Sequence, residues 1–373
     1  MTYLLNFIQS GTLPGTIPGI AEKFPDSLLK SINLTPDMDK AATIKDIARQ
    51  LHISTSTVSR AMRGQSDVSA DTKRAVLALA EKLDYQPNRL ALNLQSKHSQ
   101  TIGVLVPNLD YFFSTAIRGI DEMALDAGYT VMVCQSNESY GREVVNTRRL
   151  MESQVDGLII SVSSETKSFD HFKRLQEKGI PMVFFDRDIF GLEAPKVVLD
   201  NYVGAFKATE HLILQGCQRI AFLGGPENLS ISNKRKEGYL AALKQNKIRH
   251  DKSLIVHCEF SQDYALVATE ELLRLKKPPD GIFAVSDRIA LGAFLAIKEK
   301  GLRMPEDIAL VGFNNEPITK LLTPSISSVD QPAFQMGKDA ARLMIELLHS
   351  NEKINDSLIN LKPNLIIRQS SKK

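Results

Sequence analysis

The chain has 373 residues, of which 43% are hydrophobic, a formal net charge of +3 and three cysteines. This length allows more than one domain, and no apolar run is long enough to cross a membrane. The odd number and wide spacing of Cys134, Cys217 and Cys258 argue against a disulfide framework or a zinc motif.

Residues 1–40 have apolar letters interrupted by glycine and proline, and they lack a basic start. They therefore do not resemble a signal peptide. We expect this extension to be disordered or to reflect a misassigned start, with Met38 as the alternative beginning.

Residues 43–64 have the pattern of a helix-turn-helix. Thr43 with Asp46 predicts a capped helix start. His52 falls at the tight turn, where it tolerates a left-handed backbone better than most residues. Ser54 is expected to cap the second helix, and Gly64 to end it. The first helix has an apolar face because four residues recur at helical spacing: Ile44, Ile47, Ala48 and Leu51.

The outward surface of the second helix is expected to bind DNA. Val58, Ala61 and Met62 can face inward. Short hydroxyls and arginines remain outside, at Thr55, Ser56, Thr57, Ser59, Arg60 and Arg63. Short side chains let a helix approach base edges, and arginine can bind guanine or phosphate. An ordinary amphipathic helix is the alternative, but the turn spacing, the two caps and a third helix together favour DNA binding.

The third helix should begin near Ser69 and end before Pro87, completing a domain over residues 41–87. Its buried stripe is Val76, Leu79, Ala80 and Leu83. Residues 88–98 follow as a hinge, too short to be helical alone, that should fold against a partner chain and DNA. An apolar side chain there could wedge between base steps in a minor groove.

The charges are distributed unevenly. Residues 40–98 hold ten Lys/Arg and five Asp/Glu, whereas residues 99–373 hold 34 of each. The positive excess therefore lies on the small N-terminal part, as phosphate binding requires.

Residues 99–373 alternate short apolar runs with helical patterns, which predicts parallel sheets with helices on both faces. The expected helices include 202–215 and 291–300. The expected strands are 102–106, 130–134, 157–162, 182–185, 220–223, 281–285 and 308–311. Ligands of such folds bind beyond the carboxyl ends of the strands, and two lobes of this kind would form a cleft.

Seven residues near strand ends are candidates for binding a small molecule: Phe112, Phe113, Asp186, Arg235, Phe260, Asp287 and Asn314. Aromatic faces with a few polar groups suit a sugar or a small polar metabolite. Alternatives remain open: the two phenylalanines as ordinary core, Asp287 as a helix cap, and Asp186 with Arg187 as a structural salt bridge. No pattern predicts a catalytic constellation, a cofactor or a metal site, and Gly224-Gly225-Pro226 lacks the lysine of a P-loop.

From about residue 42 to 370 the chain resembles the LacI/GalR family of bacterial repressors, through IKDIARQLHISTSTVSRAMRG, RIAFLGGP, RKEGYLAAL and DIALVGFNNEP. The resemblance implies a cytoplasmic, nucleoid-associated homodimer, sometimes a tetramer, on a palindromic DNA operator. It also implies a periplasmic-binding-protein-like domain whose chain crosses between lobes near Asp200, Ser328 and Leu361. The N-lobe would comprise residues 99–200 and 329–360, and the C-lobe 201–328 and 361–373.

The resemblance also implies residue roles. Thr55 and Ser56 match base-reading positions, Leu94 matches the intercalating leucine, and Arg235 matches the ligand-binding arginine. DNA-contacting or positioning residues correspond to Ser54, Ser59, Arg60 and Asn88, with Arg89 beside them. His52 replaces the usual turn glycine, and Asn314 stands where several relatives have aspartate, so effector identity does not transfer directly.

The leading hypothesis is a ligand-controlled transcriptional repressor. A solute-binding protein shares the second domain, but it should carry an export signal and lack residues 43–98. An enzyme of the doubly wound class would need a cofactor loop or a catalytic constellation, which the sequence does not suggest.

Overall fold

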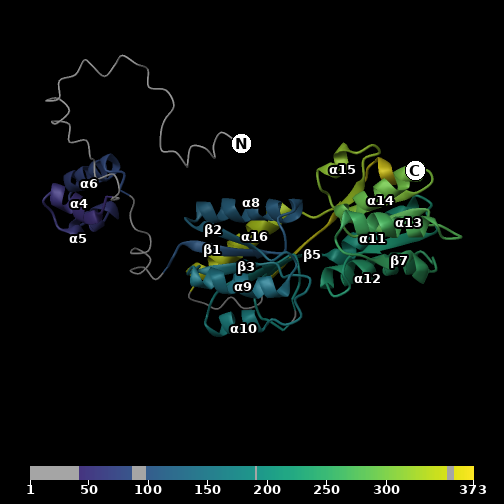
Figure 1. Cartoon of the computed structure of the whole chain (residues 1–373), viewed down its shortest axis with the longest axis horizontal. Helices are drawn as coiled ribbons and strands as arrows, with labels where there is room; N and C mark the ends of the chain where they lie inside the picture. Colours follow the sequence, from purple (N-terminus) through teal and green to yellow (C-terminus); the bar gives the residue numbers. More distant parts are fainter. Residues whose placement is uncertain (1–41, 86–97, 190, 351–356) are drawn as a thin grey trace, which may run out of the picture. The chain divides into compact units, whose positions relative to one another are not determined.

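The computed structural model describes residues 42–85, 98–189, 191–350 and 357–373. The chain divides into two compact units, Met1–Leu92 and Asn93–Lys373, whose elements are drawn in Figure 1. Residues 1–40 and the expected hinge residues Asn88, Arg89 and Leu94 lie outside the described residues.

The N-terminal unit contains three described helices, α4 (Ile44–Gln50), α5 (Thr55–Met62) and α6 (Ala70–Lys82). Thr43 and Asp46 form the expected capping box, and the hydroxyls of Ser54 and Ser69 cap α5 and α6. The helices pack around a small apolar core that includes Ile47, Ala48, Val58, Ala61, Val68, Val76 and Ala80. These caps and the core confirm the expected helix-turn-helix.

Two left-handed residues shape the ends of these helices. His52 has a φ of 54° at the turn between α4 and α5, as its position in the sequence predicted. α6 ends at Lys82, since Asp84 already has a φ of 46°. The C-terminal end of α6 is therefore determined by the left-handed Asp84 and not by Pro87.

The first lobe of the second unit is built on a six-stranded sheet in the order β11-β5-β4-β3-β1-β2, with every neighbouring pair parallel. Its strands are β1 (Thr101–Val106), β2 (Thr130–Gln135), β3 (Gly157–Ile160), β4 (Met182–Phe185), β5 (Lys196–Leu199) and β11 (Leu358–Leu361). Its helices are α8 (Tyr111–Asp126), α9 (Tyr140–Glu152), α10 (Asp170–Glu177) and α16 (Ala333–His349). Figure 1 shows α8 and α9 on opposite faces of the sheet.

The second lobe has a six-stranded sheet in the order β12-β10-β9-β8-β6-β7, parallel except between β10 and β12. Its strands are β6 (Ile220–Gly224), β7 (Ile255–His257), β8 (Gly281–Ala284), β9 (Ala309–Asn314), β10 (Ser327–Asp330) and β12 (Asn364–Ile366). Its helices are α11 (Asn201–Leu214), α12 (Ser230–Gln245), α13 (Gln262–Leu273), α14 (Asp287–Glu299) and α15 (Ile318–Leu321). Both sheets confirm the expected α/β class.

Helices α8 and α16 are packed at backbone distance. A Cβ at Gly119 would collide with the carbonyl oxygen of Phe334, and one at Gly337 with that of Ala116. Only glycine permits this approach. The contact anchors α8, whose first turn carries Phe112 and Phe113.

The chain passes between the two sheets three times. It leaves the first sheet after β5 at Asp200, returns between β10 and α16 at Gln331-Pro332, and crosses again between β11 and β12 at Lys362-Pro363. The crossing expected near Ser328 lies about three residues later, because Ser328 pairs with Gly312 inside the second sheet. Gln331 therefore lies on a connection between the lobes.

Candidate functional site

Helix α5 presents a surface of hydroxyl groups. The Ser54 Oγ accepts a 3.0 Å hydrogen bond from the Thr57 backbone N–H and lies 2.7 Å from the Ser56 Oγ. Val58 and Ala61 are buried on the opposite side of the helix, whereas Thr55 and Ser56 are exposed. The arrangement leaves short polar side chains outward, as the sequence predicted.

Two arginines flank these hydroxyls. The Arg60 Nη1 donates a 2.7 Å hydrogen bond to Asp67, and both side chains are close to half exposed. The Arg63 Nη2 donates to the Ser59 Oγ at 3.0 Å. The Arg60–Asp67 ion pair is exposed, and such pairs contribute only about 0–1 kcal/mol, so Arg60 can exchange its partner for a phosphate or a base edge.

A cavity of about 170 Å³ lies between the two lobes of the second unit. Six of the seven expected ligand residues line it: Phe112, Phe113, Asp186, Arg235, Phe260 and Asn314. Aromatic side chains come from both lobes, since Phe112 and Phe113 begin α8 and Phe260 follows β7. The rings of Phe112 and Phe113 pack edge to face at 5.0 Å, and both are nearly buried, so they serve the core and the cavity together.

Asp287 is the expected residue that does not line the cavity. It is fully buried and accepts 2.7 Å hydrogen bonds from the Ser328 hydroxyl and the Glu316 backbone N–H. Its alternative assignment as the helix cap is wrong, because the Ser286 hydroxyl caps α14. Burial raises the pKa of Asp287 to about 8, against the lowering effect of its two hydrogen bonds.

Gln331, on the second crossing, joins polar groups of both lobes. Its Nε2 donates to Asp186 at 2.7 Å, and its Oε1 accepts from the Asn314 amide at 2.8 Å. Arg235 donates to the same Oε1 at 3.4 Å. Sequence reasoning missed Gln331, because the position of the crossing was misplaced and an isolated glutamine carries no motif.

Arg235 is held firmly from α12. Its Nε donates to Asn201 at 2.8 Å, its Nη1 donates to the Val285 carbonyl at 2.5 Å, and its guanidinium lies 3.7 Å from the ring centre of Phe313. Burial lowers the pKa of Arg235 to about 10, despite the nearby Asp186, so the group stays charged at neutral pH. It is a preorganised donor at the wall of the cavity.

Asp186 has an unusual environment for a carboxyl group. It follows β4 with a φ of 64° and is 5% exposed. Burial raises its pKa, although Arg187 and Arg235 oppose that effect. The hypothesis of a salt bridge between Asp186 and Arg187 is not supported, since the carboxylate that pairs with Arg187 is Glu138.

Arg187, which follows Asp186 after β4, also lines the cavity. Both terminal nitrogens donate to the Glu138 carboxylate at 2.7 Å, and Nη1 also donates to the Val162 carbonyl at 2.8 Å. The buried Nε has no hydrogen-bond partner among the described residues. The partner could not have been found from the sequence because Glu138 lies 49 positions away.

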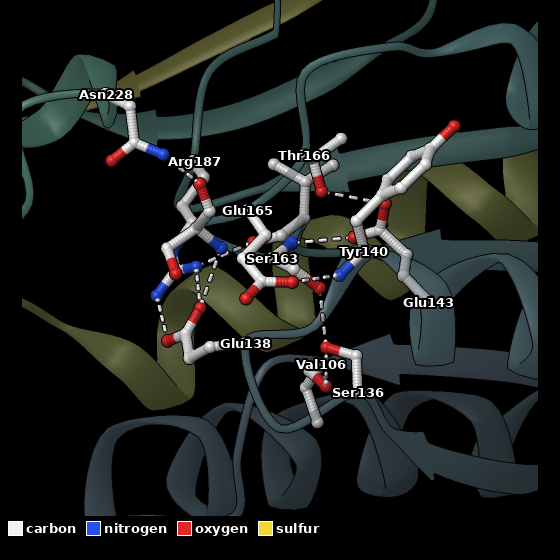
Figure 2. A network of polar contacts seen from close by, with 12 residues as sticks. Val106, Ser136, Glu138, Tyr140, Glu143, Ser163, Glu165, Thr166, Arg187 and Asn228 are labelled. Carbon is white, nitrogen blue, oxygen red and sulfur yellow. Dashed lines mark hydrogen bonds and ion pairs between the residues drawn. The ribbon is translucent and has the colours of Figure 1, made fainter.

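Figure 2 shows that this pair belongs to a larger network on the loops after β2 and β3. Glu138 accepts from the Ser164 backbone N–H at 2.8 Å. Glu143 accepts from the Ser163 backbone N–H at 2.6 Å. Asn228 of the second lobe donates to the Ser164 carbonyl, so the network also spans the cleft.

Other polar contacts hold the lobes together at the cleft. Arg288 of α14 pairs with Asp110 at 2.7 Å, and Lys234 of α12 pairs with Asp188 at 3.1 Å. Each pair joins one lobe to the other. The cavity is therefore lined by side chains whose relative position depends on how the lobes meet.

The comparisons with known proteins agree with both units. The model of the bacterial regulatory proteins of the lacI family matches residues 43–88, and a periplasmic binding protein-like domain matches residues 209–371. The ribose operon repressor of Halalkalibacterium halodurans is 34% identical over 88% of this chain and 97% of its own. The repressor CytR of Escherichia coli is 33% identical over 90% of this chain and 97% of its own.

The chain belongs to the LacI family of bacterial transcriptional regulators. The lac repressor dimer bound to operator and an anti-inducer matches with a TM-score of 0.81 and 25% identity, over 90% of this chain and all of that one. A CelR–cellobiose complex matches with a TM-score of 0.67 and 27% identity, over 88% of this chain and 99% of that one.

This LacI-family member is a DNA-binding transcriptional repressor with an effector-binding domain. The relatives named above are regulators rather than enzymes. Within the described residues, no helix has the length and apolarity needed to span a membrane, and no cluster of side chains could hold a metal ion.

Proposed function

We propose that the effector of this repressor is an uncharged, polar molecule of monosaccharide size, bound between the two lobes. The lining of the cavity carries the proposal, and its volume of about 170 Å³ leaves room for a small ligand. Aromatic faces flanked by fixed amide, carboxylate and guanidinium groups suit the apolar faces and hydroxyls of a sugar. The name of the ribose operon repressor points in the same direction.

The charges of the cavity also favour an uncharged ligand. Asp110, Asp186 and Glu316 line it together with Arg187, Arg235 and Arg288, so the two signs are equal in number. Arg187 and Arg288 already form ion pairs, with Glu138 and Asp110. Arg235 is the one lining arginine without an ion pair among the described residues, and Asp186 and Glu316 line the cavity beside it, so a bound anion would meet carboxylates as well as that guanidinium and would lose its hydration there.

We further propose that the protein acts as a cytoplasmic homodimer on a palindromic operator. Large apolar side chains stay exposed on the second unit, among them Leu125 at 70% and Leu321 at 77%, and a second copy would cover them. Thr55 and Ser56 would read base edges in the major groove, while Ser54, Ser59 and Arg60 would position the helix. Asn88, Arg89 and Leu94 would form the hinge, with Leu94 inserted in the minor groove.

The test is a titration of the full chain by calorimetry with D-ribose, D-glucose, cellobiose and cytidine. At least one uncharged monosaccharide is expected to bind at one site per chain, more tightly than the disaccharide or the nucleoside. Preferred binding of cellobiose or cytidine would contradict the proposed size, and binding of none would contradict the proposed class.

A DNA sequence selected from a random duplex pool then provides an operator for the second step. The ligand that binds should change operator affinity, and the operator should change ligand affinity by the same factor. Leu94→Ala should reduce affinity for the selected sequence more than for random DNA, because phosphate contacts are retained.

A further inference from the structure

Glu138 lies in a turn with an unusual backbone conformation. It and Asn137 have φ values of 60° and 52°, so two consecutive non-glycine residues are left-handed in the turn after β2. Such conformations persist where the surroundings over-determine them, and they are most frequent at functional sites. Here the turn brings the Glu138 carboxylate against Arg187 of the neighbouring loop (Figure 2).

The Glu138 carboxylate binds one edge of the Arg187 guanidinium, and a second edge of the guanidinium makes no bond to it. Glu138 occupies the end formed by Nη1 and Nη2, each at 2.7 Å. The side edge, formed by Nε–H and the second N–H of Nη2, remains for another partner, and Nε has none among the described residues. Arg187 lines the cavity, and its buried, unpaired Nε–H is a donor that a ligand hydroxyl beside it would satisfy.

The same ion pair balances the positive charge of Arg187, which an anionic ligand would otherwise use. Arg187 is 3% exposed, and its positive charge is balanced by Glu138, with Asp186 close by. The hydrogen bonds and charge of Arg187 lower the pKa of Glu138, although burial opposes this, so the pair is ionised at neutral pH. A phosphate at the free edge would face a guanidinium already neutralised and two carboxylates.

We propose that Glu138, which does not itself line the cavity, is a specificity-determining residue that makes the site accept an uncharged ligand and reject its phosphorylated form. The inference rests on the proposed uncharged effector and names the residue that enforces it. Replacement of Glu138 by an uncharged residue leaves a buried guanidinium without its counter-ion. A phosphate group, with its charge of about −1.5 to −2, would then supply one.

The first experiment measures the melting temperature of the full chain in increasing inorganic phosphate. Glu138→Gln keeps the size of the side chain and is expected to be stabilised by phosphate more than the wild type. Glu165→Gln is the matched control, because Glu165 lies in the same network but binds the Tyr140 backbone N–H instead of Arg187. In the double variant Glu138→Gln, Arg187→Gln the additional stabilisation should disappear.

Phosphate binding elsewhere, for example on the DNA-binding unit, affects all variants equally and cancels in the comparison. A Glu138→Gln protein that is weakened by the lost ion pair should be rescued by phosphate, so its melting temperature still reports on the site. Equal phosphate responses in the wild type, Glu138→Gln and Glu165→Gln would overturn the inference.

The second experiment measures calorimetric affinities for D-ribose against D-ribose 5-phosphate and for D-glucose against D-glucose 6-phosphate. In Glu138→Gln the preference for the uncharged member should fall by about ten- to a hundredfold, with no change in Glu165→Gln. An unchanged preference overturns the role of Glu138 while leaving the proposed effector class intact. Failure of the wild type to bind either sugar contradicts the proposed effector, while the phosphate titration still decides the role of Glu138.

Discussion

The surface of α5 and the cleft between the lobes both rely on arginine, but they hold it in opposite ways. The Arg60 side chain is 42% exposed, and its partner Asp67 is 50% exposed. Arg187 and Arg235 are 3% and 2% exposed and are fixed by several acceptors each. The exposed arginine can exchange partners, as a phosphate-binding residue must, whereas the buried pair is preorganised for one kind of ligand.

The largest effect is expected from removing a fixed arginine. Arg235→Ala leaves the Asn201 and Val285 acceptors unpaired in the buried wall, so affinity for the cleft ligand should fall by about a hundredfold or more. Calorimetry with the bound monosaccharide measures this, while operator binding without ligand should be retained. Lys236→Ala, on the same helix but paired with Glu227, is the control. Unchanged ligand affinity in Arg235→Ala would remove this residue from the site.

Replacing the exposed Arg60 should have a smaller effect on affinity, here for the operator. Arg60→Ala should weaken operator binding by about tenfold and reduce the slope of log affinity against log salt by about one, as one phosphate contact does. The exposed Arg74 of α6 provides the control variant Arg74→Ala. Fluorescence anisotropy at several salt concentrations measures both, and identical binding at every salt concentration would place Arg60 outside the interface.

Among the buried groups of the second unit, Asp287 predicts that the free energy of unfolding depends on pH. The pKa of Asp287 is about 8 in the folded chain, against 3.8 for a free group, so the folded state holds a proton that the unfolded state releases. The resulting stability is complete below pH 3.8 and is lost as the pH rises towards 8, by at most about 1.4 kcal/mol per pH unit. Urea unfolding between pH 5 and 8 should show this slope in the wild type and a flatter one in Asp287→Asn. Equal slopes would contradict a protonated Asp287.

The smallest effect concerns the partner of Arg60. Asp67→Asn removes an exposed carboxylate, so the free energy of unfolding should change by less than about 0.5 kcal/mol. DNA affinity should instead rise a few fold, because the guanidinium no longer has a competing partner. A loss of DNA affinity would show that the pair positions Arg60 rather than competing for it.

The helix-turn-helix could be predicted almost to the residue, because its determinants are local. The caps at Thr43, Ser54 and Ser69 and the turn at His52 each depend on residues within one helical turn. The strands with continuous apolar runs, such as β3 and β4, were predicted for the same reason. β10, with the sequence SSVD, and β12, with NLI, were not, because a polar tetrapeptide and a three-residue strand give no continuous apolar run.

The site was predicted as residue types near strand ends, but not as contacts. Asp186 and Asn314 line the cavity because they lie at the carboxyl ends of parallel strands, whereas Arg235 reaches it from α12. Gln331 and the pair of Glu138 with Arg187 were not foreseen, since they depend on the crossing point and on a left-handed turn. Asp287 was assigned to the ligand because a position after a strand does not reveal which way the carboxylate faces.

The most direct test of the account is the operator affinity of the full chain with and without a saturating uncharged monosaccharide, measured in parallel with ligand affinity with and without operator. The ligand is expected to change operator affinity, and the operator is expected to change ligand affinity by the same factor. Both effects should be absent in Arg235→Ala. A monosaccharide that binds in the cleft but leaves operator affinity unchanged would contradict the account.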